Sequence, residues 1–299
     1  MKMTASDWGL LGLLSVLWGG TFFFTSIAVG ELPPLTVVFL RVSIAALALF
    51  IYLGMRGITL PRNKQVWQAF LTMGFLNNVI PFSLFFWAQT TIPGGLASIA
   101  NAATPVFSIA VAHVMLADEK FTANKFFGVV LALIGVGFLF GEEVSSGASV
   151  AMLGLVACLT AALCQGFSVV YGRRFNALGL SSSVSALGQL VGTTIIMVPV
   201  ILLVDHPWTL SRPSTAAVGS IIGMALFSTA LAYLIFFRLL ATAGAVNASL
   251  VTLLIPVSAI LLGTGFLGEV LATTHFVGLA LISCGLLVID GRMFRLRRA

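Results

Sequence analysis

Three polar residues of this chain each lie four positions before a proline in strongly apolar sequence. The pairs are Asn77 with Pro81, Asn101 with Pro105, and Thr252 with Pro256. A proline inside a helix has no amide hydrogen, so the carbonyl four residues earlier loses its helical partner. In lipid such a carbonyl must face other protein atoms or a water-filled cavity. The pattern predicts three helix kinks that act as gating points, where polar side chains and free carbonyls bind polar groups of a ligand.

Asn101 and Thr252 also belong to matching stripes of small and polar residues. One stripe is Ser98, Asn101, Pro105, Ser108 and Ala112, and the other is Ser249, Thr252, Pro256, Ala259 and Gly263. Spacings of three and four place each set on one helix face. The stripes either line a cavity or let helices pack closely, with the hydroxyls bonded to their own helix. The three serines fit both explanations equally, whereas the amide of Asn101 favours the cavity.

Large and amide side chains recur at matching points of the two halves. Trp18-Gly19 overlays Gln165-Gly166, and Phe82 overlays Tyr233. Trp18, Asn77, Asn101, Gln165, Tyr233 and Thr252, with Ser98 and Arg41, are therefore the predicted substrate-binding residues. Aromatic rings beside amides suit a ligand with an apolar or aromatic body and a polar head. Trp and Tyr also form belts at membrane surfaces, so each aromatic residue has that alternative role.

Arg41 and His113 are ionisable residues that fall inside predicted spans. Arg41 lies about 10 Å below one surface, at 1.5 Å of rise per residue. It either attracts a substrate carboxylate or bonds the helix-end carbonyls of a neighbour, and His113 is expected near the opposite surface. Proton-coupled carriers use membrane-embedded carboxylates as relays. Because no Asp or Glu lies at mid-span, the sequence favours facilitated diffusion or exchange, with His113 as a reserve proton carrier.

The composition indicates which elements position these residues. Of 299 residues, 59% are hydrophobic and 8% are charged, and the mean hydropathy is +1.12. A soluble domain carries about 25% charged residues, so a soluble enzyme, a disordered chain and a nucleic-acid-binding protein are excluded. The length accommodates roughly ten transmembrane helices of about 20 residues. They are predicted at 8–29, 35–53, 66–88, 94–117, 123–141, 150–171, 184–204, 216–237, 245–267 and 273–289.

The charged residues predict the orientation of these helices. All but two of the 15 basic residues fall on one side when the spans alternate; Arg212 lies on the other side and Arg41 within a span. Basic residues concentrate in short cytoplasmic loops, so both termini are predicted to be cytoplasmic. The cysteines, Cys158, Cys164 and Cys284, have no metal-ligand spacing, and no cofactor or metal site is predicted.

The second half of the chain repeats the first. Ala97-Ser98-Ile99 matches Ala248-Ser249-Leu250, Asn77-Asn78 matches Ser228-Thr229, and Glu119 matches Glu269. We therefore divide the chain into two five-helix units, 1–145 and 146–299. Because five is odd, the second unit crosses the membrane in the opposite direction. Inverted repeats are typical of transporters in which two halves rock around a midplane site.

Several motifs resemble the EamA repeat of the drug/metabolite transporter superfamily. They are Leu17-Trp18-Gly19, Pro33-Pro34, Phe39-Leu40-Arg41, Ala103-Thr104-Pro105 and Asp118-Glu119, then Leu254-Ile255-Pro256 and Leu267-Gly268-Glu269. The resemblance covers nearly the whole chain and implies an all-α polytopic membrane protein of ten helices. Within the superfamily the chain is most similar to bacterial inner-membrane exporters of amino acids, in particular the YddG-type aromatic amino-acid exporters.

Two other functions share this composition. A flippase of a lipid precursor would need basic residues along the path of a phosphate, and Arg41 is the single candidate. An intramembrane enzyme would need a His-Glu-x-x-His pair, mid-span acids or a His beside a Ser, and no such set is recognisable. We expect a carrier and no enzyme, a monomer or weak dimer, with a small-molecule substrate and membrane lipid as partners and no nucleic acid.

Overall fold

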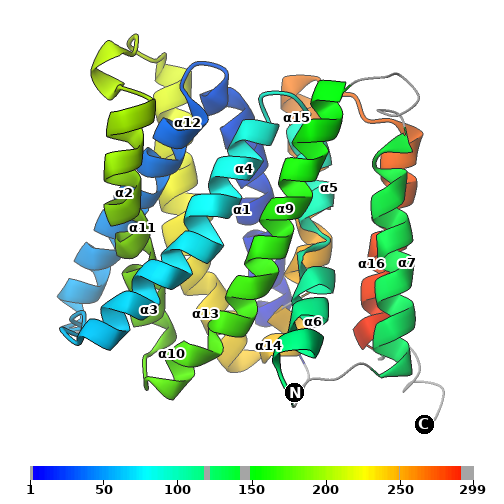
Figure 1. Cartoon of the computed structure of the whole chain (residues 1–299), viewed down its shortest axis with the longest axis horizontal. Coiled ribbons are helices and arrows are strands. Elements are labelled where there is room, and N and C mark those ends of the chain that lie inside the picture. The colour runs from blue at the N-terminus through cyan, green and yellow to red at the C-terminus, as the bar shows by residue number, and fades with distance from the viewer. Residues whose placement is uncertain (1–2, 118–121, 142–148, 249, 291–299) are drawn as a thin grey trace.

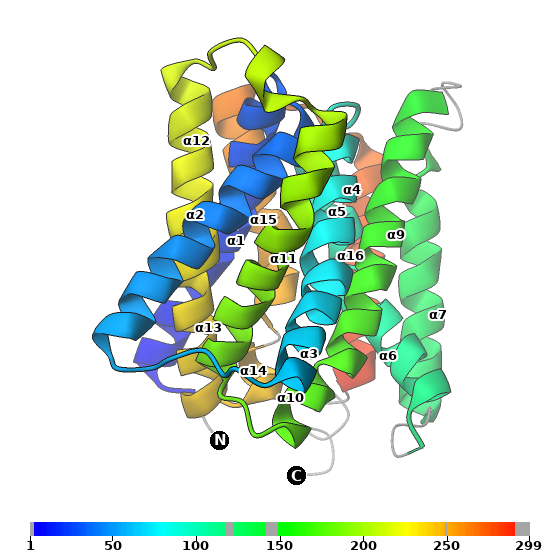
Figure 2. The same ribbon diagram turned by 60° about the vertical axis from the view of Figure 1, so that its left-hand side comes forward.

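The computed structural model describes residues 3–117, 122–141, 149–248 and 250–290. Within these ranges the chain is helical and has no β-strand. The helices lie side by side along a roughly common direction (Figures 1 and 2). The start of α1 (Ala5–Val29) and the end of α16 (Thr273–Asp290) lie at the same end of the bundle. Helices occupy every apolar segment that the sequence predicts.

The other helices follow in chain order. The first half continues with α2 (Pro34–Met55), α3 (Lys64–Gly74), the π-helical turn η1 (Phe75–Val79), α4 (Ile80–Ala88), α5 (Gly94–Asn101), α6 (Thr104–Met115) and α7 (Ala123–Phe138). The second half contains α9 (Ser149–Tyr171), α10 (Arg173–Ala177), α11 (Ser182–Val204), the short 3₁₀ turn η2 (Pro207–Thr209), α12 (Thr215–Ala225), the π-helical turn η3 (Leu226–Leu231), α13 (Ala232–Thr242), α14 (Ala245–Ala248) and α15 (Val251–Leu267).

Local capping explains where several helices begin. At α1 the Thr4 side chain accepts a hydrogen bond from the Asp7 amide, and the Asp7 carboxylate accepts one from the Thr4 amide. The Ser214 hydroxyl accepts the Ala217 amide at the start of α12. Pro34 begins α2, because an amide in the first turn has no helical partner to lose. These caps satisfy the amides that helix starts leave unpaired.

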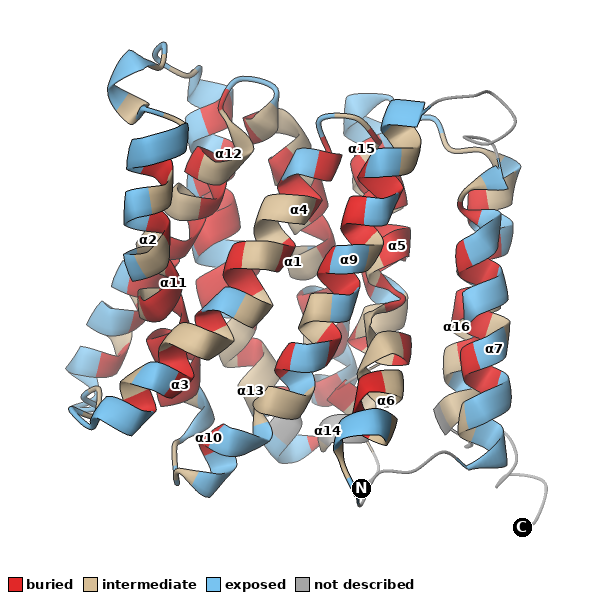
Figure 3. Ribbon diagram, in the orientation of Figure 1, coloured by how far each residue is buried: buried red, intermediate tan, exposed pale blue. Residues whose placement is uncertain are grey.

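The surface of the bundle is apolar, as a lipid environment requires. Among the described residues, seven helical segments are long and apolar enough to cross a membrane. Three shorter apolar helices are Ala123–Phe138, Val251–Leu267 and Thr273–Ile289. Leu47, Phe127 and Leu261 expose most of their surface in mid-helix, and Figure 3 shows exposed residues facing away from neighbouring helices. Such surfaces would cause aggregation in water, so they must face lipid. This chain is therefore a multi-pass membrane protein.

The three prolines lie close to interruptions of regular α-helix, each of a different kind. Pro81 lies in the first turn of α4, two residues after the end of η1. Pro105 is in the first turn of α6, after a break at Ala102 and Ala103 that separates it from α5. Pro256 lies within α15, which continues past it, and the break is earlier, between α14 and α15. Ser249 lies outside the described residues, as do Glu119, Lys120 and the arginines beyond residue 290.

Glycines allow two helix pairs to approach closely. On α1, a Cβ added to Gly19 would lie 2.6 Å from Ser258 Cβ of α15. On α7, a Cβ at Gly128 would lie 2.6 Å from the Gly285 oxygen of α16, and one at Gly135 would lie 2.8 Å from the Gly278 oxygen. Small residues permit this backbone contact between membrane helices. The α7–α16 pair stands at one edge of the molecule (Figure 1), and the α1–α15 pair lies beside the cavity described next.

Candidate functional site

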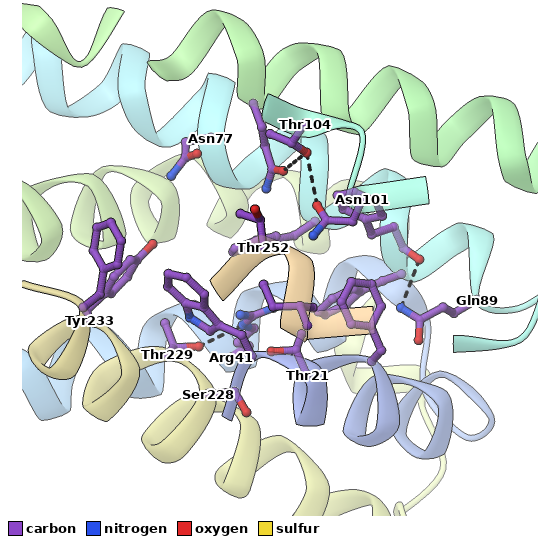
Figure 4. A pocket seen from close by; sticks show the side chains of 18 of the residues that line it. Thr21, Arg41, Asn77, Gln89, Asn101, Thr104, Ser228, Thr229, Tyr233 and Thr252 are labelled. Atoms are coloured by element: carbon purple, nitrogen blue, oxygen red, sulfur yellow. Dashed lines mark hydrogen bonds between the residues drawn. The ribbon is translucent and has the colours of Figure 1, made fainter. Parts of the chain in front are cut away.

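A cavity of about 360 Å³ lies among the central helices. Its lining comes from both halves of the chain (Figure 4). The lining residues are Trp18, Thr21, Phe22, Arg41, Asn77, Phe82, Phe85, Phe86, Gln89, Asn101, Thr104, Gln165, Val169, Ser228, Thr229, Tyr233, Phe236, Thr252 and Ile255. The volume falls within the range of small-molecule sites, about 300–1,000 Å³.

All the predicted substrate-binding residues except Ser98 line this cavity. Ser98 is fully buried elsewhere in α5, where its hydroxyl donates to the Gly95 carbonyl oxygen at 2.6 Å. The close-packing explanation of the stripe therefore describes Ser98. Asn101 and Thr252, from the two stripes, come together at the cavity (Figure 4).

The sequence analysis missed five polar residues of the lining: Thr21, Gln89, Thr104, Ser228 and Thr229. Ser228 and Thr229 carried a usable signal, because they overlay Asn77 and Asn78 in the repeat. Both pairs lie in π-helical turns, η1 and η3. Such turns widen the helix by one residue and occur frequently at functional sites.

Side chains of the second half of the chain hold η1 in place. The Asn77 Nδ2 donates to Gln189 Oε1 at 3.1 Å, and its Oδ1 lies 2.9 Å from the Ser168 hydroxyl. The next residue, Asn78, is fully buried and donates to the Thr193 hydroxyl at 2.9 Å. These bonds fix Asn77 at the cavity wall through α9 and α11.

Arg41 reaches the cavity from α2 and bonds to η3. Its Nε donates to the Thr229 hydroxyl oxygen at 2.9 Å, and that hydroxyl donates to the Met224 carbonyl oxygen at 3.0 Å. The guanidinium carbon lies 4.2 Å from the centre of the Phe82 ring and 5.6 Å from that of Phe86. Arg41 is 4% exposed, and its NH1 atom has no hydrogen-bond partner in the described protein. A neighbouring helix-end carbonyl is therefore not the partner of NH1.

Thr104 connects the two halves on another wall. Its hydroxyl lies 3.3 Å from Asn101 Oδ1 and 3.2 Å from Gln165 Oε1 (Figure 4). A hydroxyl has one proton to donate, so it serves one of these oxygens at a time. The other amide oxygen retains capacity to accept a hydrogen bond from a ligand.

Aromatic rings form the rest of the wall. Trp18 and Phe236 lie 5.4 Å apart between ring centres, and Phe82 stacks on Phe86 at 6.1 Å. The cavity thus combines an aromatic surface, amide and hydroxyl groups, and one cation. No Asp or Glu is among the described residues that line it, and the described part of the chain has no cluster of metal-ligating side chains. This combination suits an amphipathic small molecule.

Comparisons with known proteins relate the chain to membrane transporters. The model of the EamA-like transporter family matches twice, at residues 7–141 and 152–290. The chain is 26% identical to "Uncharacterized transporter YoaV" of Bacillus subtilis, with 93% of this chain and 94% of the relative covered. It is 26% identical to "Uncharacterized inner membrane transporter YedA" of Escherichia coli, covering 92% and 87%.

A further relative carries a more specific name. "Probable amino-acid metabolite efflux pump" of Salmonella typhimurium is 27% identical, with 99% of this chain and 98% of that protein covered. A solved crystal structure superimposes with a TM-score of 0.67 at 20% identity, covering 96% of this chain and 98% of the other. That likeness concerns the fold.

Proposed function

Because the chain belongs to the EamA-like transporter family, we propose that it exports small amphipathic metabolites across a bacterial inner membrane. Amino acids, including aromatic ones, are the first candidates, as in the YddG-type exporters. The observation that carries this proposal is the cavity, which both halves build from an aromatic wall and a polar wall. The efflux pump among the relatives supports the direction of transport.

The proposed architecture is ten membrane-spanning helices in two inverted five-helix repeats, 1–145 and 146–299, with both termini cytoplasmic. Two matches to one family model support the repeat. So does the pairing of α7 with α16, in which Gly128 contacts Gly285 and Gly135 contacts Gly278. The order of these contacts is antiparallel, as expected for equivalent helices related by a twofold axis in the membrane plane.

In this proposal the two halves rock around the cavity by alternating access. The breaks beside Pro81 and Pro105, and the one that precedes α15, are the points where helices bend. With no carboxylate among the described lining residues, the protein acts as a facilitator or exchanger, as a monomer or weak dimer.

Transport by the purified protein in liposomes tests the proposal. Liposomes loaded with labelled phenylalanine should release it faster than protein-free liposomes, and external unlabelled phenylalanine should change the rate. The same preparation with a fluorescent phospholipid tests the flippase alternative. Lipid movement without amino-acid release would contradict the proposed function.

A further inference from the structure

Among the described residues, Arg41 is a buried cation with no anionic partner. Its hydrogen-bonded neighbour, Thr229, is neutral, and its NH1 atom is buried with no partner in the described protein. The face of the Phe82 ring at 4.2 Å compensates part of the cost of burial through a cation–π interaction. A buried guanidinium normally pairs with a carboxylate, because burial of an unpaired charge is expensive. NH1 is thus left without a partner in a side chain that lines the cavity.

The surroundings of Arg41 do not balance its charge. The side chains near it are the phenyl rings of Phe82 and Phe86, the Thr229 hydroxyl and the Tyr233 phenol. Neither these nor the other described lining residues include a carboxylate. The nine acidic residues of the sequence all lie away from mid-span. The cavity therefore carries a net charge of +1 when it is empty.

We propose that this carrier selects organic monoanions, with a carboxylate bound at NH1 of Arg41 and an apolar or aromatic body against Trp18 and Phe236. The proposal rests on the proposed function, whose cavity it uses, and ranks its amphipathic substrates by charge: metabolites with a net charge of −1 are preferred, and zwitterionic amino acids bind more weakly. A zwitterion brings the same carboxylate and also an ammonium. The lining offers that ammonium only neutral oxygens, such as Asn101 Oδ1 and Gln165 Oε1. Because the described lining residues include no carboxylate, the ammonium cannot form a charge-assisted hydrogen bond with one.

The charge balance also supplies a driving force. A bound monoanion neutralises the cavity, and the empty carrier returns with its positive charge, so one negative charge leaves the cell in each cycle. A potential that is negative inside draws the empty, positive cavity back toward the cytoplasm. Each 100 mV sustains about a fiftyfold concentration ratio of a monoanion. Export of this kind requires no coupling ion.

A matched series of probes tests the proposal on the intact protein. 3-Phenylpropanoate, phenylalanine and 2-phenylethylamine share one aromatic body and carry charges of −1, zero and +1 at neutral pH. Binding is measured by tryptophan fluorescence, and efflux from liposomes is measured with and without a potassium diffusion potential. We expect 3-phenylpropanoate to bind roughly tenfold or more tightly than phenylalanine, and its efflux alone to accelerate at inside-negative potential.

Two arginine variants, one within α2 and one directly after it, complete the experiment. Arg41→Gln should weaken 3-phenylpropanoate binding roughly ten- to hundredfold without loss of folded protein, because removal of a buried, unpaired charge offsets the lost contacts with Thr229 and Phe82. Arg56→Gln, on an exposed residue at the end of the same helix, should leave binding unchanged. The comparison of the three probes needs no variant, so it stands even if Arg41→Gln does not fold.

The outcomes separate this proposal from the proposed function. Phenylalanine that binds as tightly as 3-phenylpropanoate, with efflux insensitive to potential, would overturn the monoanion proposal and leave amino-acid export intact. Transport of none of the three probes would contradict the proposed function, and the monoanion proposal with it.

Discussion

Glu31 and Ser214 join two loops that are distant in the sequence. The Ser214 hydroxyl donates to one carboxylate oxygen of Glu31 at 2.5 Å and its amide donates to the other at 2.7 Å. These bonds lower the pKa of Glu31 below its usual 4.5, because they favour the ionised carboxylate. Since the folded-state pKa is the lower one, the stabilisation is present above pH 4.5 and is lost as the pH falls through the folded-state value.

Glu31→Gln should therefore lower the melting temperature of the detergent-solubilised protein at pH 7, and this difference should shrink as the pH falls below 4.5. The measurement is the difference in melting temperature between variant and unmodified protein across this range. Arg212→Gln, in the same loop as Ser214, is the control and should give no such trend. A difference in melting temperature that does not change with pH would contradict the stabilising role of the ionised Glu31 carboxylate.

At residue scale, the sequence identified seven of the nineteen lining residues, mostly through proline spacing and the repeat, which can be recognised in the sequence alone. Asn77, Asn101 and Thr252 were found through their prolines. The bond from Arg41 to Thr229 joins residues 188 positions apart, and no local pattern encodes such a pair. Thr104 was likewise missed, since its role depends on Gln165 of the other half.

At the scale of elements, helix positions were predictable from hydropathy, whereas the π-helical turns were not. A π turn differs from an α-helix in which carbonyl each amide bonds, and apolar periodicity is nearly the same for both. Pro81 marks the end of η1, but no proline accompanies η3. The break between α5 and α6 was predicted as a kink and is instead a separation of two helices.

The α7–α16 contact gives a prediction for the elements. Gly135→Leu should reduce folded yield and thermal stability, because the new side chain would meet the Gly278 oxygen and the Ile282 amide at 2.8 Å; overpacking costs about 1–3 kcal/mol. The control is Gly137→Leu on the same helix, whose Cβ would meet nothing within 4 Å. Equal thermal stability of the two variants in detergent would show that the close approach is unimportant.

At the scale of the whole molecule, the charge asymmetry predicts the orientation in the membrane. In a variant with Cys158, Cys164 and Cys284 replaced, Arg62→Cys should react with an impermeant thiol reagent only from the cytoplasmic side, and Arg212→Cys only from the outside. Labelling of the residue 62 position in intact cells would contradict the orientation and with it the inward position of both termini.

The same scale gives a prediction about energy coupling. Efflux of a substrate down its concentration gradient should continue when the proton gradient is collapsed at constant membrane potential, because no carboxylate among the described lining residues is available as a proton relay. Rates are measured in liposomes with and without a protonophore, under a potassium clamp. Loss of efflux on addition of the protonophore would indicate proton coupling.

The central claim is that this cavity is the transport site, and efflux per molecule of folded protein tests it most directly. Asn101→Leu and Thr252→Leu fill space and remove a hydrogen-bonding group at the cavity wall, where a lost bond to a ligand is worth about 0.5–1.5 kcal/mol. We predict that each lowers efflux severalfold while expression and melting temperature change little, since the helix interruption persists without the side chain. Normal efflux by both variants, or a loss that only follows protein level, would contradict the claim.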